Sequence, residues 1–253
     1  MGSEFKLYYY RHNPFFILAC FIILGCLLQN FILSEDNIES VKEALSVSSE
    51  GLIYQNFAID TITFLSMVYF IYCSASSIIN DKKNGVFIYS FVKNIPPIKI
   101  QIHKLVGAYV FVVSSNLFLI LFTSIVTLLI YGWRKEMIIN AFLLLIAKSY
   151  TSIFYVTLAI LFALVVNNYV FVLSVLFIIE MAKIAIYSML NEFSFSKFII
   201  LDHIDISYFF NLPSTGIDRG YSLPFTLLIY MAYIIIFQLL AFYTFNKKRG
   251  MLI

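Results

Sequence analysis

Residues 80–105 read NDKKNGVFIYSFVKNIPPIKIQIHKL and form a long polar interruption in a chain that is otherwise strongly apolar. The apolar residues of this stretch recur at the i, i+3, i+4 and i+7 spacing of one helix face: Ile88, Phe91, Val92 and Ile95. This spacing predicts a short amphipathic helix, and the Pro96-Pro97 pair predicts where it stops, because proline disfavours helix at the residue before it. Lysines flank the stretch on both sides. A short helix of this kind suits docking onto a soluble partner or lying on lipid headgroups.

The composition of the whole chain excludes a soluble globular domain. Of its 253 residues, 61% are hydrophobic and only 12% are charged, which is the composition of a membrane protein. The formal net charge of +3 is the charge bias expected of a chain that faces lipid, and it gives no reason to expect a nucleic-acid partner.

Six apolar runs have the length of membrane spans. A helix needs about 20 apolar residues to cross the hydrocarbon core, and runs of about that length or more occupy residues 14–33, 57–79, 105–131, 137–166, 169–190 and 223–245. They leave no room for a second domain. The sequence therefore predicts an all-α integral membrane protein with six transmembrane helices.

The distribution of lysine and arginine predicts the orientation of the chain. Most of them fall near both termini and in residues 80–104, whereas most acids fall in the loops of the opposite side. Because positive loops stay on the cytoplasmic side, both termini and residues 80–104 are expected to be cytoplasmic. Residues 191–222 are then external.

The cytoplasmic stretch resembles the intracellular coupling segment of type 2 ATP-binding cassette (ABC-2) exporter permeases. In that family an acidic residue and a glycine precede a helix, a proline follows it and a lysine opens the next span. The matching positions are Asp81, Gly85, Pro96 or Pro97, and Lys104. The chain departs from the pattern in having Asp where Glu is usual, a displaced and doubled proline, and Lys99 where an arginine often sits.

The last external segment, residues 191–222, is too polar for a span and too apolar for a free loop. Its apolar side chains include Phe198, Ile204, Phe209 and Phe210. This pattern predicts one or two short interfacial or re-entrant helices, broken at Pro213 and Gly216. The ABC-2 family carries a pair of such helices between the fifth and sixth spans, where they form an outer lid, so the segment supports the same resemblance.

Four strongly ionisable residues fall inside the predicted spans: Asp60, Lys148, Glu180 and Lys183. A charge in the hydrocarbon costs about 3 kcal/mol unless it is paired. Glu180 and Lys183 are one helical turn apart and can pair. Lys148 is expected to complete a polar cluster with them. Asp60 lies near the outer boundary of its span, where it is expected to reach water. Two interpretations of the cluster stay open: it lines a translocation route or dimer contact, or it is an internal ion pair that fixes helix register.

Several classes of enzyme lack support in the sequence. None of the nine glycines is followed by lysine, so the chain has no Gly-x4-Gly-Lys-Ser/Thr phosphate loop. No residues suggest an intramembrane hydrolase, and the three cysteines lie inside predicted spans without metal-ligand spacing. We therefore expect no catalytic residue, metal or cofactor in this chain.

The resemblance implies a transporter subunit in a bacterial plasma membrane. Such permeases pair with a second permease chain, as homodimer or heterodimer, above two ATPase subunits that bind ATP and Mg. The apolar and aromatic spans favour an amphipathic or lipid-like cargo, and exporters of phenol-soluble modulins or immunity transporters for peptide antibiotics resemble this chain in size. The alternatives are a secondary carrier or channel that acts alone, and a membrane sensor or assembly protein.

Overall fold

The computed structural model describes residues 14–32, 50–93, 95–190, 193, 195–210 and 220–252. All regular structure in these residues is helical, which confirms the expected all-α class. The long helices are α2 (Pro14–Ile32), α4 (Glu50–Lys83), α6 (Pro97–Tyr131), α7 (Lys135–Val165), α8 (Tyr169–Leu190) and α9 (Leu223–Leu252). The short ones are α5 (Val86–Val92) and the 3-10 helices η1 (Ser196–Phe198), η2 (Ile200–Asp202) and η3 (Ser207–Phe210).

Four helices in the described part of the chain are long and apolar enough to cross a membrane. They are α4, α6, α7 and the 223–247 portion of α9. Their presence indicates a membrane protein. Helices α2 and α8 cover the other two predicted spans but fall outside this set of four, so a count of six spans stays a prediction.

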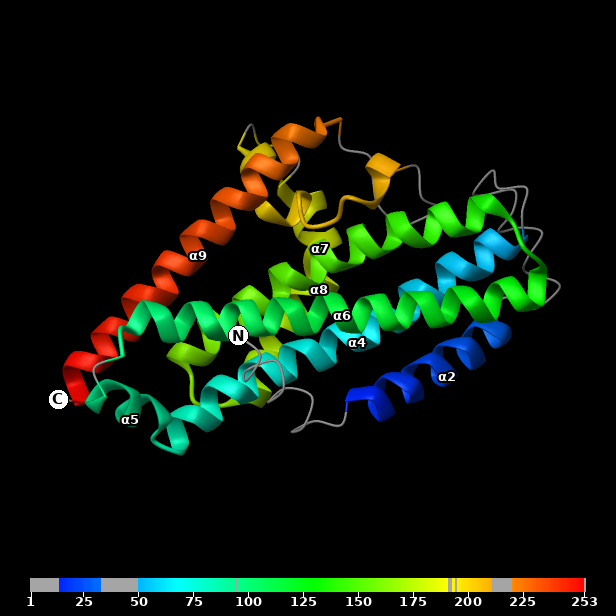
Figure 1. Ribbon diagram of the computed structural model, residues 1–253. Coiled ribbons are helices and arrows are strands. Elements are labelled where there is room, and N and C mark those ends of the chain that lie inside the picture. Colours follow the sequence, from blue (N-terminus) through cyan, green and yellow to red (C-terminus); the bar gives the residue numbers. More distant parts are fainter. Residues whose placement is uncertain are drawn as a thin grey trace.

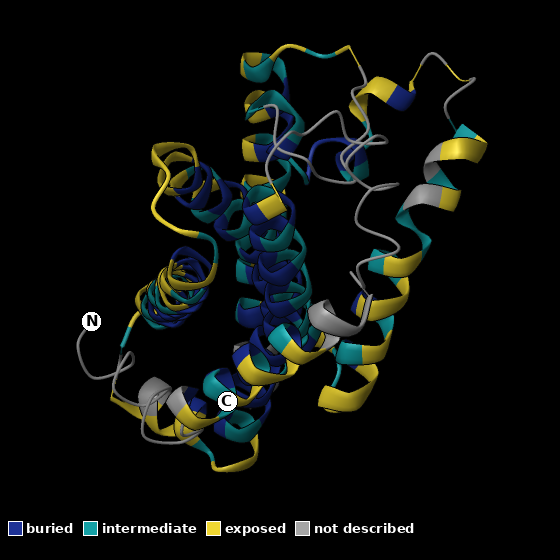
Figure 2. Cartoon of the chain, turned by 90° about the vertical axis from the view of Figure 1, so that its right-hand side faces the viewer, coloured by how far each residue is buried: buried dark blue, intermediate teal, exposed yellow. Residues whose placement is uncertain are grey.

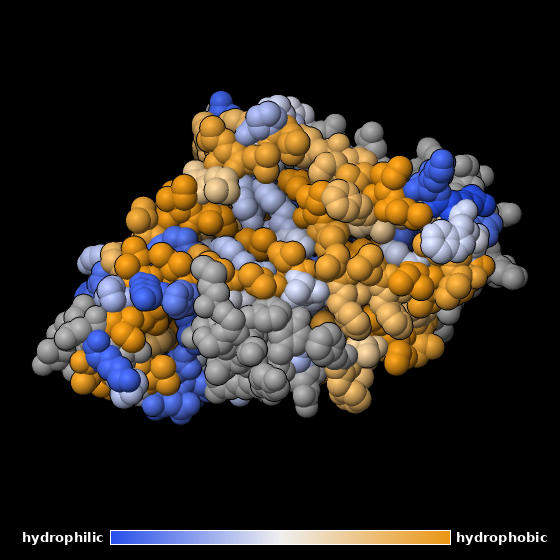
Figure 3. Space-filling model, viewed as in Figure 1, coloured by the Kyte–Doolittle hydropathy of each residue, from blue (hydrophilic) through white to orange (hydrophobic). Residues whose placement is uncertain are grey.

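Helix α4 lies at the centre of the bundle and packs against α7, α6, α2 and α8 (Figures 1 and 2). Its most apolar window is 78% buried, whereas that of α9 is only 22% buried. Helix α9 crosses one side of the bundle obliquely and leaves an apolar face exposed (Figure 3). Since the large exposed side chains of α9 are mostly apolar, its outer face is suited to lipid or to another membrane chain.

The polar interruption is shorter than the sequence predicts. Helix α4 continues to Lys83 and α6 begins at Pro97, so only residues 84–96 link the two helices, instead of the 80–104 expected. Among the polar residues at these helix ends, Asp81 pairs with Lys104 and Lys82 bonds to the end of α7, and proline is compatible with the first turn of a helix. Both helices therefore extend beyond the predicted spans 57–79 and 105–131, into the polar stretch.

Helices α7 and α8 are joined by residues 166–168 and pack against each other. The Asn168 side chain caps α8, because its Oδ1 accepts a hydrogen bond from the backbone N–H of Val170 at 2.9 Å. From α4, Lys82 donates to the carbonyl oxygens of Ala163 and, at 2.8 Å, Leu164. A cation on the last carbonyls of α7 favours that helix end electrostatically, and it ties the ends of α4 and α7 together.

A glycine sets the close approach of α2 to α4. A Cβ added at Gly25 would lie 2.3 Å from Cγ1 of Ile62, and Ile62 is buried. We expect Gly25→Ala to push α2 away from α4 and to lower the free energy of unfolding by about 1–3 kcal/mol. Thermal unfolding in detergent would measure this, with Cys20→Ala on the exposed face of α2 as the control. Adding Ile62→Ala should partly relieve the clash, and equal stability of Gly25→Ala and wild type would contradict the prediction.

Candidate functional site

A cavity of about 260 Å³ lies between α4, α7, α8 and the segment between η2 and η3. Its polar lining comes from all four elements: Asp60 and Thr63 of α4, Lys148, Thr151 and Ser152 of α7, Glu180 and Lys183 of α8, and Asp205. Its apolar lining comes from α4 alone: Phe57, Phe64 and Met67. The structure thus brings together Lys148, Glu180 and Lys183, which the sequence grouped as one polar cluster.

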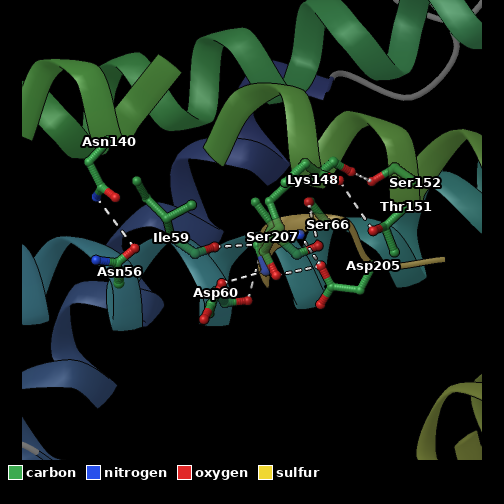
Figure 4. Close-up of polar contacts among 12 residues, drawn as sticks. Asn56, Ile59, Asp60, Ser66, Asn140, Lys148, Thr151, Ser152, Asp205 and Ser207 are labelled. Atoms are coloured by element: carbon green, nitrogen blue, oxygen red, sulfur yellow. Dashed lines mark hydrogen bonds and ion pairs between the residues drawn. The ribbon is translucent and has the colours of Figure 1, made fainter. Parts of the chain in front are cut away.

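Each lysine of the cavity is paired with a carboxylate. The Nζ of Lys148 lies 2.5 Å from Oδ1 of Asp60, which links α7 to α4 (Figure 4). The Nζ of Lys183 lies 2.6 Å from Oε1 of Glu180, one turn away on α8, as the spacing predicted. The other oxygen of Glu180 accepts a hydrogen bond from the hydroxyl of Tyr155 on α7. The side chain of Asp60, which was expected to reach water, is 30% exposed and also pairs with Lys148.

The structure adds Asp205, a site residue that the sequence did not single out. Its Oδ1 accepts hydrogen bonds from the backbone N–H of Ser207 at 2.9 Å and from the Ser207 hydroxyl at 2.5 Å. Burial raises the pKa of Asp205, but the positive charge of Lys148 and the Ser207 hydrogen bonds outweigh burial, so this pKa lies below its usual value. Asp205 is therefore a carboxylate at neutral pH.

The segment 195–210 packs over this end of the bundle. Its described residues form three short 3-10 helices, in the region where the sequence predicts one or two short helices. On α7, Tyr150 donates to the carbonyl oxygen of His203 at 3.1 Å and Thr151 to that of Ile204 at 3.0 Å. The His203 ring is buried and contacts the Thr226 hydroxyl of α9 at 3.1 Å. Hydrogen bonds to α7 and α9 thus hold the segment in place.

The predicted lid residues divide into two groups. Ile204 is buried, whereas Phe198 is half exposed, and Phe209 and Phe210 are partly buried against α4, α6 and α7 residues. The predicted breaks at Pro213 and Gly216 lie outside the described residues. The aromatic side chains therefore do not share one environment.

At the opposite end of the bundle, two residues of the coupling pattern form a buried ion pair. The Nζ of Lys104 on α6 lies 2.6 Å from Oδ2 of Asp81 on α4, and the two side chains are only 5% and 8% exposed. Burial removes both from contact with a soluble partner. Their place in the structure is instead to hold the end of α4 against the start of α6.

The short helix α5 lies beside this ion pair and exposes an apolar surface. Ile88 and Val92, from the predicted face, are 47% and 76% exposed, and Tyr89 is 60% exposed. Phe87 turns inward and packs edge-on against Phe245 of α9, with ring centroids 4.9 Å apart. The helix is therefore anchored at one side chain and presents others to the outside. This surface, made of Ile88, Tyr89 and Val92, is called the α5 face below.

The remaining coupling residues shape the two ends of α5. Gly85 has φ of 68°, a left-handed conformation that favours glycine, and it turns the chain between α4 and α5. Pro96 stands at the N-cap of α6 and Pro97 is its first residue, so the doubled proline fixes the start of α6. Ile95 is partly buried, and the side chain of Phe91 lies outside the described residues.

A scan against protein-family models finds no match for this chain, and a search of curated proteins finds none either. The resemblance of residues 80–104 to ABC-2 permeases therefore stays a hypothesis from sequence.

Proposed function

We propose that this chain is the membrane-spanning subunit of an ATP-driven exporter of the ABC-2 class, with six spans and cytoplasmic termini in a bacterial plasma membrane. The observation that carries the proposal is the α5 face, whose three apolar side chains are 47–76% exposed at the lysine-rich end of the bundle. A separate ATPase, holding ATP and Mg, would cover this face. The chain itself would hydrolyse nothing.

The contacts around α5 would transmit a movement of this helix to the long helices of the bundle. Phe87 joins α5 to α9, and the turn at Gly85 joins it to the end of α4. That end is bonded to α6 through Asp81 and to α7 through Lys82. A partner that moved α5 would therefore act on four long helices. This is the mechanical link that the coupling segment provides in the proposed class.

The rest of the assembly follows from the same proposal. A second permease chain and membrane lipid would cover the exposed apolar faces of α6 and α9, because one chain of this size is too small to enclose a pathway comfortably. The cargo would be amphipathic or lipid-like, such as a toxin or antimicrobial peptide. The polar cavity and aromatic helix surfaces together are compatible with such a cargo.

The test is a substitution on the α5 face. With an ATPase encoded in the neighbouring reading frame co-expressed, we expect Val92→Asp to reduce the stimulation of ATP hydrolysis by about tenfold, because a carboxylate in an apolar contact must be desolvated without a partner. Hydrolysis by the purified complex in proteoliposomes measures this. The matched control is Val165→Asp at the same end of the bundle, where Val165 is 55% exposed. Normal assembly and stimulation in Val92→Asp would refute the coupling assignment.

A second candidate, a carrier that works alone, is favoured by the charged cavity. Paired lysines and carboxylates inside a membrane bundle are typical of residues on a transport route. Proteoliposomes that contain only this chain decide between the two. Cargo movement without any ATPase would favour the carrier, whereas movement that requires the ATPase and ATP would favour the exporter.

A further inference from the structure

The charged groups of the cavity do not balance. Three carboxylates, those of Asp60, Glu180 and Asp205, face two ammonium groups, those of Lys148 and Lys183. Asp60 and Glu180 each lie within 2.6 Å of one lysine, whereas Asp205 bonds to the neutral Ser207 and shares the charge of Lys148 with Asp60. The lining of this cavity therefore carries one more negative than positive charge.

The hydroxyl groups that line the cavity can act towards a ligand as hydrogen-bond acceptors but not as donors. Thr63 donates its proton to the carbonyl of Ile59, Thr151 to that of Ile204, and Ser152 to that of Lys148. A hydroxyl that has donated its single proton can only accept further hydrogen bonds. The cavity is thus provided with oxygens that can receive protons from a ligand.

The third property of the cavity is its apolar wall. Phe57, Phe64 and Met67 line it from α4, next to the charged groups. Aromatic faces attract cations as well as apolar groups. At about 260 Å³ the cavity is smaller than the roughly 300–1,000 Å³ of pockets for drug-sized ligands, so it has room for one headgroup with a short apolar chain.

We propose that this cavity binds the primary ammonium group of a small amphiphile, with Asp205 supplying the uncompensated charge and α4 the apolar wall. The ammonium would lie among the oxygens of Asp205, Thr151 and Ser152, and its chain would pack on Phe64 and Met67. An organic cation fits better than a metal ion, because no three His, Cys, Asp or Glu side chains in the described ranges are placed as metal ligands.

This inference goes beyond the proposed function and does not depend on it. The site would serve a carrier as well as an exporter subunit, and it is tested without an ATPase. Loss of ATPase coupling in Val92→Asp and loss of ammonium binding in a cavity variant are separate results, so failure of one proposal is distinguishable from failure of the other.

The experiment measures binding of dansylcadaverine to the full chain in lipid nanodiscs by fluorescence anisotropy. Its primary ammonium and pentyl chain would enter the cavity, and its dansyl group would stay outside as the fluorescent reporter. Its N-acetylated form, which has no charge, serves as the matched probe. Wild type is expected to bind the amine at least about tenfold more tightly than the acetylated form. Asp205→Asn should weaken amine binding about tenfold, because Asn keeps an oxygen for Ser207 but removes the charge. Glu136→Gln, an exposed acid at the start of α7, should bind as wild type does.

Removing a positive charge should act in the opposite direction. Lys183→Gln leaves the cavity more negative, so its affinity for dansylcadaverine should rise severalfold. The proposal is overturned by equal affinity of wild type for the amine and its acetylated form, a result that needs no variant. It is also overturned if Asp205→Asn, checked for folding by size exclusion, binds the amine as wild type does, or if dansylglycine, an anionic probe, binds more tightly than the amine.

Discussion

Replacing Asp81 with leucine is expected to lower the free energy of unfolding by about 3–5 kcal/mol, because it leaves the Lys104 ammonium buried without its carboxylate. The two side chains are 8% and 5% exposed and their charged atoms are 2.6 Å apart, so water cannot easily replace the missing partner. Unfolding by SDS in mixed micelles measures the change. Lys83→Met, an exposed cation two residues further along α4, should change stability by less than about 0.5 kcal/mol.

The double variant Asp81→Leu/Lys104→Met separates loss of the pair from loss of either charge. A buried ion pair often contributes little more than apolar residues of similar size, because desolvation offsets the attraction. The double variant should therefore recover most of the stability that each single variant loses. Additive losses in the two single variants would show that Asp81 and Lys104 do not act as a pair, and would contradict this account of how α4 holds α6.

The same variants bear on coupling. If the ion pair holds the start of α6 against the end of α4, the double variant should stimulate the proposed ATPase normally, since an apolar contact can hold α4 and α6 together as well. Stability and coupling would then depend on how tightly α4 and α6 pack, and not on the charges of Asp81 and Lys104. The family pattern of an acid and a lysine would in that case reflect helix packing, with contact to the motor left to the α5 face.

The sequence predicted those parts of the cavity that depend on local spacing. Glu180 and Lys183 are separated by one helical turn, so their pairing follows from helix geometry alone. The contact of Asp60 with Lys148 depends on how α4 packs against α7, and two residues so far apart in the chain give no sign of it. Asp205 was missed for the same reason, since it reaches the cavity only because Thr151 and Tyr150 hold the segment around it.

Helix ends were the least predictable part of the fold. Residues 80–83 and 97–104 contain eight charged or polar side chains, so hydropathy placed them outside the predicted spans. They are helical because Asp81, Lys82 and Lys104 find partners on neighbouring helices. The type and number of long helices could be predicted, since long apolar runs have few alternatives in a membrane. Ion pairs between residues on different helices, in contrast, leave no recognisable pattern in the sequence.

Lys148→Met is expected to have the second large effect, a loss of about 3–5 kcal/mol in the free energy of unfolding at pH 7. Lys148 is bonded to Asp60 at 2.5 Å and its charge also stabilises Asp205. Without it, three carboxylates of the cavity share one remaining lysine. Lys135→Met, an exposed cation at the start of the same helix, is the control and should be nearly neutral.

The dependence of this loss on pH distinguishes electrostatics from packing. In wild type the pKa of Asp205 lies below the value of about 3.8 that it has in the unfolded chain, so its contribution is complete above about pH 4 and is lost as the pH falls further. In Lys148→Met burial is opposed only by the Ser207 hydrogen bonds and Lys183, and the Asp60 carboxylate, now without its lysine, adds repulsion, so the pKa of Asp205 should rise above its unfolded value. The contribution of Asp205 then has the opposite sign: it is favourable at low pH and is lost as the pH rises.

Lys148→Met should therefore lie closer to wild type at pH 5 than at pH 7, when both are unfolded by SDS in the same micelles. Adding Asp60→Asn to Lys148→Met should restore part of the stability at pH 7, because it removes one of the carboxylates left without a lysine. If the deficit were the same at the two pH values and unchanged by Asp60→Asn, lost packing of the lysine stem would explain it. The uncompensated charge assigned to the cavity would then lack support, since it depends on the same carboxylates being ionised together.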